Sequence, residues 1–288
     1  MLKNTVAVVS ATLSLFVSAC RTPASTAETR PAVSALLRQV EDTYHGMHSY
    51  ESTGDLTENM STGLGGLGEL HFRFAMKLAR PNFYRIEWEE HEPNEMAKGA
   101  VWYAGDGNFV TGPRMASPLH AKDMTTALSM ATGISGGAAY TLPSIFFGLK
   151  PNTLAGLKDA ALERDAVSNG EPCFVIVGKS VTGGETIWVS KKSKLILQIR
   201  DEFKGAVKFP AFTDQQIKEV LQSMNQTPTP DAINRMKAQM TLARTIANSG
   251  IRGYTTQVYR QIVVNAKLSK ADFAVKALET YGRKATAE

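Results

Sequence analysis

The sequence predicts an α+β protein built on one antiparallel β-sheet, and two observations support this fold class. Runs of alternating apolar and polar residues, separated by short turns, follow one another through residues 50–111 and again through residues 173–201. Segments with helical spacing lie at both ends of these runs and in the interval between them. Strands joined directly by short turns pair as antiparallel hairpins, whereas a parallel sheet needs strands and helices in alternation.

The first predicted element is an amphipathic helix over residues 32–47. Leu36, Val40 and Tyr44 recur at the spacing of one helix face, and the helix is expected to end near Gly46. A short strand over residues 50–56 follows, and we expect Gly54 to limit it.

The clearest strand signal lies in residues 69–79. Its apolar side chains fall at every second position, with His71, Arg73 and Lys77 between them, and this period is typical of a half-buried strand. Turn chemistry at residues 80–82 separates it from a second strand over residues 83–89, which has Tyr84, Ile86 and Trp88 on one face.

The remaining chain predicts further strands with helices between and after them. Residues 100–103 and 108–111 form a hairpin around a glycine-containing turn. Residues 133–139 are rich in glycine, and residues 142–149 form a dense apolar patch. The other predicted strands are residues 173–178, 185–189, 195–201 and 255–264, and the other predicted helices are residues 123–131, 214–224, 231–248 and 269–281, the last with Ser269 as its cap.

The amino terminus has the pattern of an export signal. Lys3 precedes an uncharged apolar run over residues 6–19, which is too short to span a membrane and ends in small residues before Cys20. This stretch resembles the lipobox of bacterial lipoproteins, which implies a signal peptide over residues 1–19 and acylation of Cys20. Arg21 after that cysteine implies sorting to the periplasmic face of the outer membrane. The alternative is an ordinary cleaved signal with an incidental cysteine.

Composition and charge indicate how the chain is organised and which classes of function it does not favour. Residues 20–31 read as a lipidated flexible tether, which leaves residues 32–288 as a single domain with a helical insertion around 214–250. The net charge of +5 is mild and scattered, so no dense basic run indicates nucleic-acid binding. With Cys20 acylated, Cys173 would be the single remaining thiol, and its apolar surroundings favour a buried, inert side chain.

Three motif matches are rejected on context. Residues 63–68 fit G-x-G-x-x-G, but a strand follows where a dinucleotide fingerprint needs a helix. Residues 133–137 fit G-x-S-x-G, but every histidine precedes Ser135, which is the wrong order for an α/β-hydrolase triad. His45 and His48, like the acidic cluster over residues 87–92, lack a complete set of metal ligands. We therefore expect no catalytic residues, no cofactor and no metal.

Four segments, in this order, resemble the Lol-type (LolA/LolB-like) lipoprotein-sorting and carrier proteins of the outer membrane and their exported relatives. The segments are Tyr50-x-Ser52-x-Gly54, Arg80-Pro81-Asn82-x-Tyr84-Arg85, Val101-Trp102-Tyr103-x-Gly105-Asp106-Gly107, and Thr186-x-Trp188-Val189 ahead of residues 195–199. The likeness covers residues 36–203, and a weaker likeness covers residues 258–273. It implies a curved antiparallel sheet, a half-open barrel, with helices covering its concave face.

The resemblance also implies a lipid or an acyl chain as the ligand, held in an apolar cavity, with a role in lipid or lipoprotein transport to the outer membrane. The residues expected to line the cavity are Leu70, Phe72, Phe74, Met76, Tyr84, Ile86, Trp88, Trp102, Phe146 and Phe147. Residues 142–149 would form part of the lid.

Three alternatives stay open. The apolar stripe reads equally as an ordinary core covered by helices. The protein could instead be a non-catalytic sensing or interaction module of the envelope that binds a protein partner. An enzyme would have to use carboxylates such as Asp106 or Glu185, both of which we expect at glycine turns.

Overall fold

The computed structural model describes residues 30–62, 65–91, 96–112, 115, 117–180, 183–205, 211–224 and 226–275. The chain divides into two compact units, residues 1–31 and residues 32–288. The predicted signal peptide, Cys20 and nearly all of the predicted tether lie outside the described residues. None of the described helices is both long enough and apolar enough to cross a membrane.

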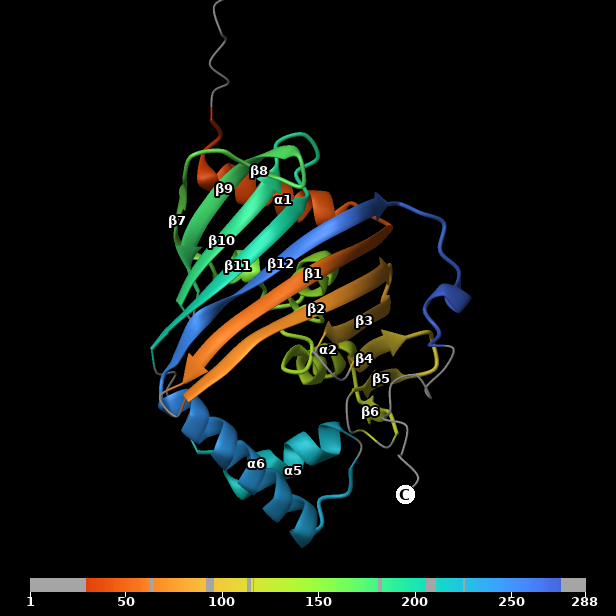
Figure 1. The fold of residues 1–288 in the computed structure, drawn as a ribbon. Helices are drawn as coiled ribbons and strands as arrows, with labels where there is room; N and C mark the ends of the chain where they lie inside the picture. The colour runs from red at the N-terminus through yellow and green to blue at the C-terminus, as the bar shows by residue number, and fades with distance from the viewer. Residues whose placement is uncertain are drawn as a thin grey trace, which may run out of the picture. The chain divides into compact units, whose positions relative to one another are not determined.

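The second unit is an α+β structure built on one open antiparallel sheet, which Figure 1 shows as strongly twisted and curved. Its strands run in the order β6-β5-β4-β3-β2-β1-β12-β11-β10-β9-β7, and β8 pairs with β9. The strands are β1 (Ser49–Thr62), β2 (Gly65–Ala79), β3 (Phe83–His91), β4 (Met96–Tyr103), β5 (Asn108–Thr111), β6 (Leu119–Ala121), β7 (Lys158–Leu162), β8 (Ala166–Ser168), β9 (Glu171–Lys179), β10 (Gly183–Ser190), β11 (Ile196–Gly205) and β12 (Ile251–Val264). The predicted fold class is confirmed.

The helices come before the sheet, in its middle and before its last strand. They are α1 (Val33–His45), α2 (Met124–Thr132), α3 (Thr141–Phe147), α4 (Thr153–Gly156), α5 (Asp214–Ser223) and α6 (Pro230–Asn248). Buried side chains of α1 to α4 join those of the strands in one core cluster, so these helices cover the concave face of the sheet. The helical hairpin α5–α6 lies between β11 and β12 in the chain.

Helix α1 packs because its apolar side chains recur every fourth residue. Leu36, Val40 and Tyr44 are fully buried, and the helix stops immediately before Gly46, as predicted. The amide of Ile196 on β11 donates a hydrogen bond to the Tyr44 hydroxyl oxygen over 3.1 Å. This bond ties the first helix to a strand more than 150 positions further along the chain.

Strand β1 runs past Gly54 to Thr62, so the predicted limit at Gly54 is wrong. A Cβ atom at Gly54 would lie 2.2 Å from Cζ of Phe74, its cross-strand neighbour on β2. Glycine here makes room for the Phe74 ring and leaves the hydrogen-bonded ladder intact. The residue that suggested the end of a strand is instead a packing requirement in the middle of one.

Arg80, in the turn between β2 and β3, holds the helical cover to the sheet. Its guanidinium donates to the carbonyl oxygen of Phe146 on α3 over 2.6 Å, and to that of Met47 after α1 over 3.1 Å. It also lies 5.0 Å from the centroid of the Phe146 ring. Charge-assisted bonds of this kind are stronger than bonds between neutral groups, so this turn fixes both helices.

The chain after β12 does not form the helix predicted over residues 269–281. A single 3-10 turn, Lys270–Asp272, is followed by irregular chain up to residue 275, and residues 276–281 lie outside the described part. The side chain of Phe273 instead packs against Trp102, Ala100 and Phe83 on the convex face of the sheet. We call residues 265–275 the C-terminal strap.

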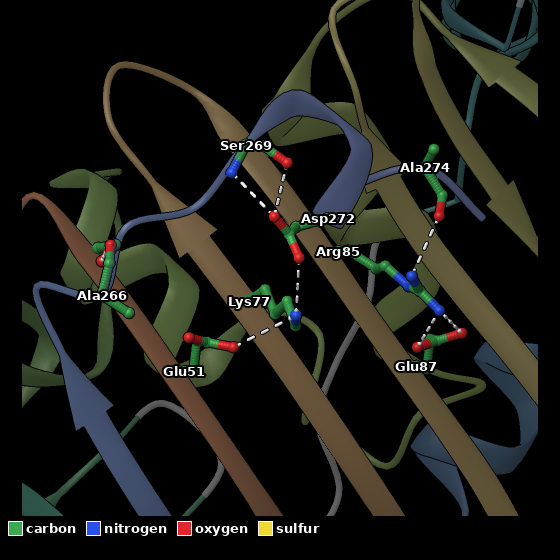
Figure 2. Close-up of polar contacts among 9 residues, drawn as sticks. Glu51, Lys77, Arg85, Glu87, Ala266, Ser269, Asp272 and Ala274 are labelled. Carbon is green, nitrogen blue, oxygen red and sulfur yellow. Dashed lines mark hydrogen bonds and ion pairs between the residues drawn. The ribbon is translucent and has the colours of Figure 1, made fainter. Parts of the chain in front are cut away.

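Ion pairs and hydrogen bonds hold the strap to the sheet (Figure 2). Lys77 lies 3.3 Å from both Glu51 and Asp272, and Arg85 donates to the carbonyl oxygen of Ala274 over 3.0 Å. The amide and hydroxyl of Ser269 each donate to Asp272 over 2.8 Å. The amide bond, the hydroxyl bond and the Lys77 charge together lower the pKa of Asp272 to about 2.

Candidate functional site

The concave face of the sheet brings together all of the predicted lining residues except Trp102. Cross-strand register places Phe74 opposite Trp88 and Met76 opposite Ile86. Helix α3 closes over these residues, because the ring of Phe147 meets that of Tyr84 edge-on at 6.3 Å. The apolar patch predicted to act as a lid is therefore this short helix and its flanks.

Trp102 lies on the opposite, convex face, so its predicted place in the lining is wrong. Register pairs Val101 with Ile86, and Val101 takes the concave position on β4. Because successive side chains in a strand point to opposite faces, Trp102 must point away. It packs with Phe109 and Phe273 in the separate convex cluster.

The covered part of the concave face is packed, and its accessibility rises toward one end. Phe72, Phe74 and Trp88 are at most 6% exposed. Leu70, which continues the same row of side chains on β2, is half-buried. Met60 on the neighbouring strand β1 and Phe203 on β11 also occupy concave positions and are half-buried. We call Leu70, Met60 and Phe203 the apolar rim.

The glycine-rich segment between α2 and α3 approaches the sheet closely. A Cβ atom at Gly136 would lie 2.7 Å from Cδ2 of Leu56, and one at Gly137 would lie 3.2 Å from Nε2 of Gln257. Both glycines have positive φ, +59° and +97°. The rejected nucleophile motif is thus a packing turn, in which the Ser135 hydroxyl accepts from the Ala139 amide over 3.1 Å.

A row of polar side chains crosses the concave face next to the apolar rim. Glu185 on β10 lies opposite Asp201 on β11, Asp201 lies opposite Thr255 on β12, and Thr255 lies opposite Glu58 on β1. We call these residues the carboxylate row. Glu185 and Thr255 are each 4% exposed, and Glu185, which was expected at a glycine turn, lies in β10 directly after Gly184.

The environment raises the pKa of all three carboxyl groups in the row. Burial raises the pKa of Glu185 to about 8, and the neighbouring charge of Asp201 adds to this increase. Burial raises the pKa of Asp201 to about 6, against an opposing hydrogen bond from Thr255. Burial and the charge of Glu90 raise the pKa of Glu58. The two opposed carboxyl groups therefore hold their protons more tightly than solvent-exposed carboxyl groups do.

The sequence itself carries a signal for this row. In residues 185–189, Glu185 shares the parity of Ile187 and Val189, which are fully buried. Asp201 likewise shares the parity of Ile199. An acid at an apolar position of a strand predicts a buried carboxyl group, and register then decides whether two such groups meet.

In the described part of the chain, no three His, Cys, Asp or Glu side chains gather as a possible metal site. Of the acidic positions rejected as ligands, Glu87 and Glu89 are on the convex face, where Glu87 pairs with Arg85 over 2.8 Å and Glu89 with Lys98 over 3.5 Å. Glu90 lies on the concave face, opposite Phe72. The convex face also carries a groove of about 430 Å³ over β12 and β1 to β4, lined in part by Arg73, Ala75 and Arg260.

Comparison with known proteins finds similarity among solved structures. No protein-family model and no curated protein sequence matches the chain. A DUF1329 family protein from Desulfovibrio piger is 13% identical over 85% of this chain and 98% of that chain, with a TM-score of 0.33. The lipoprotein LppX from Mycobacterium tuberculosis is 11% identical over 83% and 99%, with a TM-score of 0.37. A LolA superfamily protein from Nitrosomonas europaea is 9% identical over 85% and 99%, with a TM-score of 0.29.

Proposed function

We propose that this protein is a non-catalytic envelope lipoprotein that binds a lipid or an acyl chain against the concave face of its sheet. The observation that carries the proposal is the half-buried apolar rim on the concave face. Leu70 continues the apolar row of β2, and Met60 and Phe203 lie beyond the carboxylate row on β1 and β11. A core that served stability alone would gain by burying this rim, since each large apolar side chain contributes about 1.5–3 kcal/mol when buried.

The rim offers an acyl chain a place to begin binding. From Leu70 the row of apolar side chains runs inward to Phe72 and Phe74 on the same strand. Ligand sites for apolar molecules are commonly lined by aromatic and aliphatic side chains with a few polar groups, and this face has both. The chain would follow this row under α2 and α3, with a shift of the short helices to admit it.

Anchoring and location belong to the same proposal. Acylation of Cys20 would hold the protein at the periplasmic face of the outer membrane, since two or three acyl chains anchor a protein stably. Replacing Cys20 by serine is expected to release the protein from the membrane fraction after cell lysis. Retention of the serine variant in that fraction would contradict the lipid anchor.

Ligand binding is tested by native mass spectrometry of the protein purified gently from a bacterial envelope. The mass of the folded protein is compared with that of the denatured, acylated chain, so that covalent acyl groups do not count as ligand. An additional, solvent-extractable mass of lipid size is the expected result. A protein without added mass that also fails to bind added fatty acids would contradict the proposal, and a co-purifying polypeptide would favour the interaction module.

A matched pair of variants locates the ligand. Leu70→Asp places a charge on the apolar rim, and Ala75→Asp makes a comparable change at an exposed position on the opposite face of the same strand. We expect the first variant to lose the bound lipid and the second to keep it. Circular dichroism and thermal unfolding verify that both variants are folded. Equal lipid content in the two variants would show that the apolar rim is not part of the lipid-binding site.

A further inference from the structure

We infer that Glu185 and Asp201 form a recognition site for a positively charged amino group, carried by an amphiphilic ligand on the concave face. This inference rests on the proposed function and specifies the chemical class of the ligand's polar end. It starts from an arrangement that the fold alone does not explain. Two carboxyl groups lie directly opposite each other on neighbouring strands, at positions of which one is 4% exposed.

Like charges at directly opposed positions of a sheet destabilise it, and burial adds to the penalty. Within the described part of the chain, no lysine, arginine or histidine forms an ion pair with either carboxyl group. The interactions that the structure gives this pair are the mutual repulsion and the hydrogen bond between Asp201 and Thr255. The pair therefore lacks the counter-charge that buried carboxylates ordinarily have.

The orientation of an unsatisfied acceptor points to a ligand. Oε1 of Glu185 is buried and has no hydrogen-bond partner among the described residues, although Glu185 faces Asp201 across the strand pair. Buried acceptors without a partner are rare in native proteins, and each needs a specific explanation. An ammonium group has three donors and a positive charge, so it can satisfy Oε1 of Glu185 and the Asp201 carboxylate together.

The surroundings favour an amine on an apolar chain over a free inorganic cation. Ile187 and Ile199 lie on the same face, two residues along from Glu185 and Asp201, and they belong to the apolar core cluster. Because Ile187 and Ile199 are at most 1% exposed, a ligand with its ammonium group between the two carboxyl groups would lay its chain on the half-buried Phe203, two residues beyond Asp201 on the same face. Asp201 is half-buried, which leaves the pair open on that side.

The test compares two ligands of equal chain length. Dodecylamine and 1-dodecanol are titrated separately into the full chain at pH 7, and bound ligand is measured by native mass spectrometry. We expect the amine to bind about ten times more tightly than the alcohol, since a charge-assisted hydrogen bond is roughly twice as strong as a neutral one. In the double variant Glu185→Gln/Asp201→Asn, alcohol binding should remain and the preference for the amine should disappear.

The control variant is Glu202→Gln, which removes a carboxylate from the neighbouring position of β11 that points to the opposite face. It should keep the preference for the amine. Equal binding of amine and alcohol by the unmodified protein, or a preference that survives in the double variant, would overturn the amino-group site and leave lipid binding intact. Failure of the unmodified protein to bind either ligand would overturn the proposed function as well.

Discussion

At the scale of single residues, the concave face combines tight packing with polar groups placed where apolar residues are usual. Gly54, Gly99 and Gly136 each make room for a large side chain, since a Cβ atom would lie 2.2 to 2.7 Å from Phe74, Trp88 and Leu56 respectively. Glu185 and Asp201 occupy positions with the same parity as isoleucines. The glycines allow close packing and so stabilise the fold, whereas burial of the two acids destabilises it.

Replacing Glu185 by glutamine is expected to stabilise the protein at alkaline pH. Its pKa of about 8 in the folded state lies above the usual value of 4.5, so the folded state binds the proton more tightly than the unfolded state. The stability that this proton contributes is complete below about pH 4.5 and is lost as the pH rises through 8. Since one pKa unit corresponds to about 1.4 kcal/mol, we expect a gain on the order of 2–4 kcal/mol at pH 9.

Urea unfolding of both proteins at pH 5, 7 and 9 measures this effect, and Glu202→Gln is the control. A lysine beside Glu202 lowers its pKa, so the control should gain no stability with rising pH. A difference between the Glu185→Gln variant and the unmodified protein that stays constant across the three pH values would refute the buried, protonated state of Glu185.

Gly136→Ala is expected to destabilise the fold by about 1–3 kcal/mol, because the new Cβ atom would meet Leu56 and a positive φ is unfavourable for alanine. The control is Gly133→Ala in the same segment, where φ is −68° and no atom lies within 4 Å of the added Cβ. Thermal unfolding should separate the two variants by several degrees. Similar melting temperatures would show that the turn can move away from the sheet.

At the scale of elements, the sheet is covered on both faces by different means. Helices α1 to α4 cover the concave face, and the C-terminal strap covers part of the convex face at β2 to β4. The strap is held at one point by the ring of Phe273 and around it by the contacts of Lys77 and Arg85. Exposed ion pairs contribute little to stability, so the buried ring is expected to dominate.

Phe273→Ala should therefore lower the free energy of unfolding by about 3–5 kcal/mol, as is typical when a buried aromatic ring is removed. Phe273 is 2% exposed, whereas Val167, the control position, is 69% exposed. Val167→Ala should change the free energy of unfolding by less than about 0.5 kcal/mol in the same urea titration. A small effect at Phe273 would mean that the strap contributes nothing to global stability and opens before the sheet unfolds.

At the scale of the whole molecule, the last strand joins the two halves of the sheet. Strand β12 lies between β1 and β11, so the chain returns to its centre only after the hairpin α5–α6. Gly205 at the end of β11 lies directly opposite Ile251 at the start of β12. Among the described residues, the main core cluster includes no side chain from α5 or α6.

Replacing residues 206–250 by a four-residue turn is thus expected to leave the sheet folded. The two strand ends are already neighbours, so a short turn can join them as it does in ordinary hairpins. Far-ultraviolet circular dichroism should show the loss of helix with retained strand signal, and unfolding should remain one cooperative transition. Aggregation or loss of cooperativity would mean that the hairpin covers a surface on which the sheet depends.

The sequence was sufficient for the fold class and for most elements, because period-two and helical patterns are local properties. Strands β2 and β3 and helix α1 follow directly from such patterns. Short or weakly patterned elements were missed, namely β6, β7, β8, α3 and α4. The predicted helix from Ser269 was wrong over the described residues, because packing of Phe273 on the sheet outweighed local helical spacing.

The candidate site, like the fold, was predictable from the sequence only in part. The apolar stripe on β2 and β3 was predictable, since two neighbouring strands with clear alternation must share a face. Trp102 was placed wrongly, because the parity of a strand decides its faces only once register with its neighbours is known. The meeting of Glu185 with Asp201 depends on the pairing of β10 with β11, which neither segment encodes alone.

By itself, then, the sequence determined what local patterns and composition can determine: an antiparallel α+β sheet, its apolar stripe and an amino-terminal signal pattern. The tertiary structure alone decided that β12 occupies the centre of the sheet, that Trp102 and Phe273 meet on the convex face, and that two buried carboxyl groups lie opposite each other. The physical reason is that strand order and register are set by contacts between segments distant in the chain, and such contacts leave only a faint trace in the local sequence pattern.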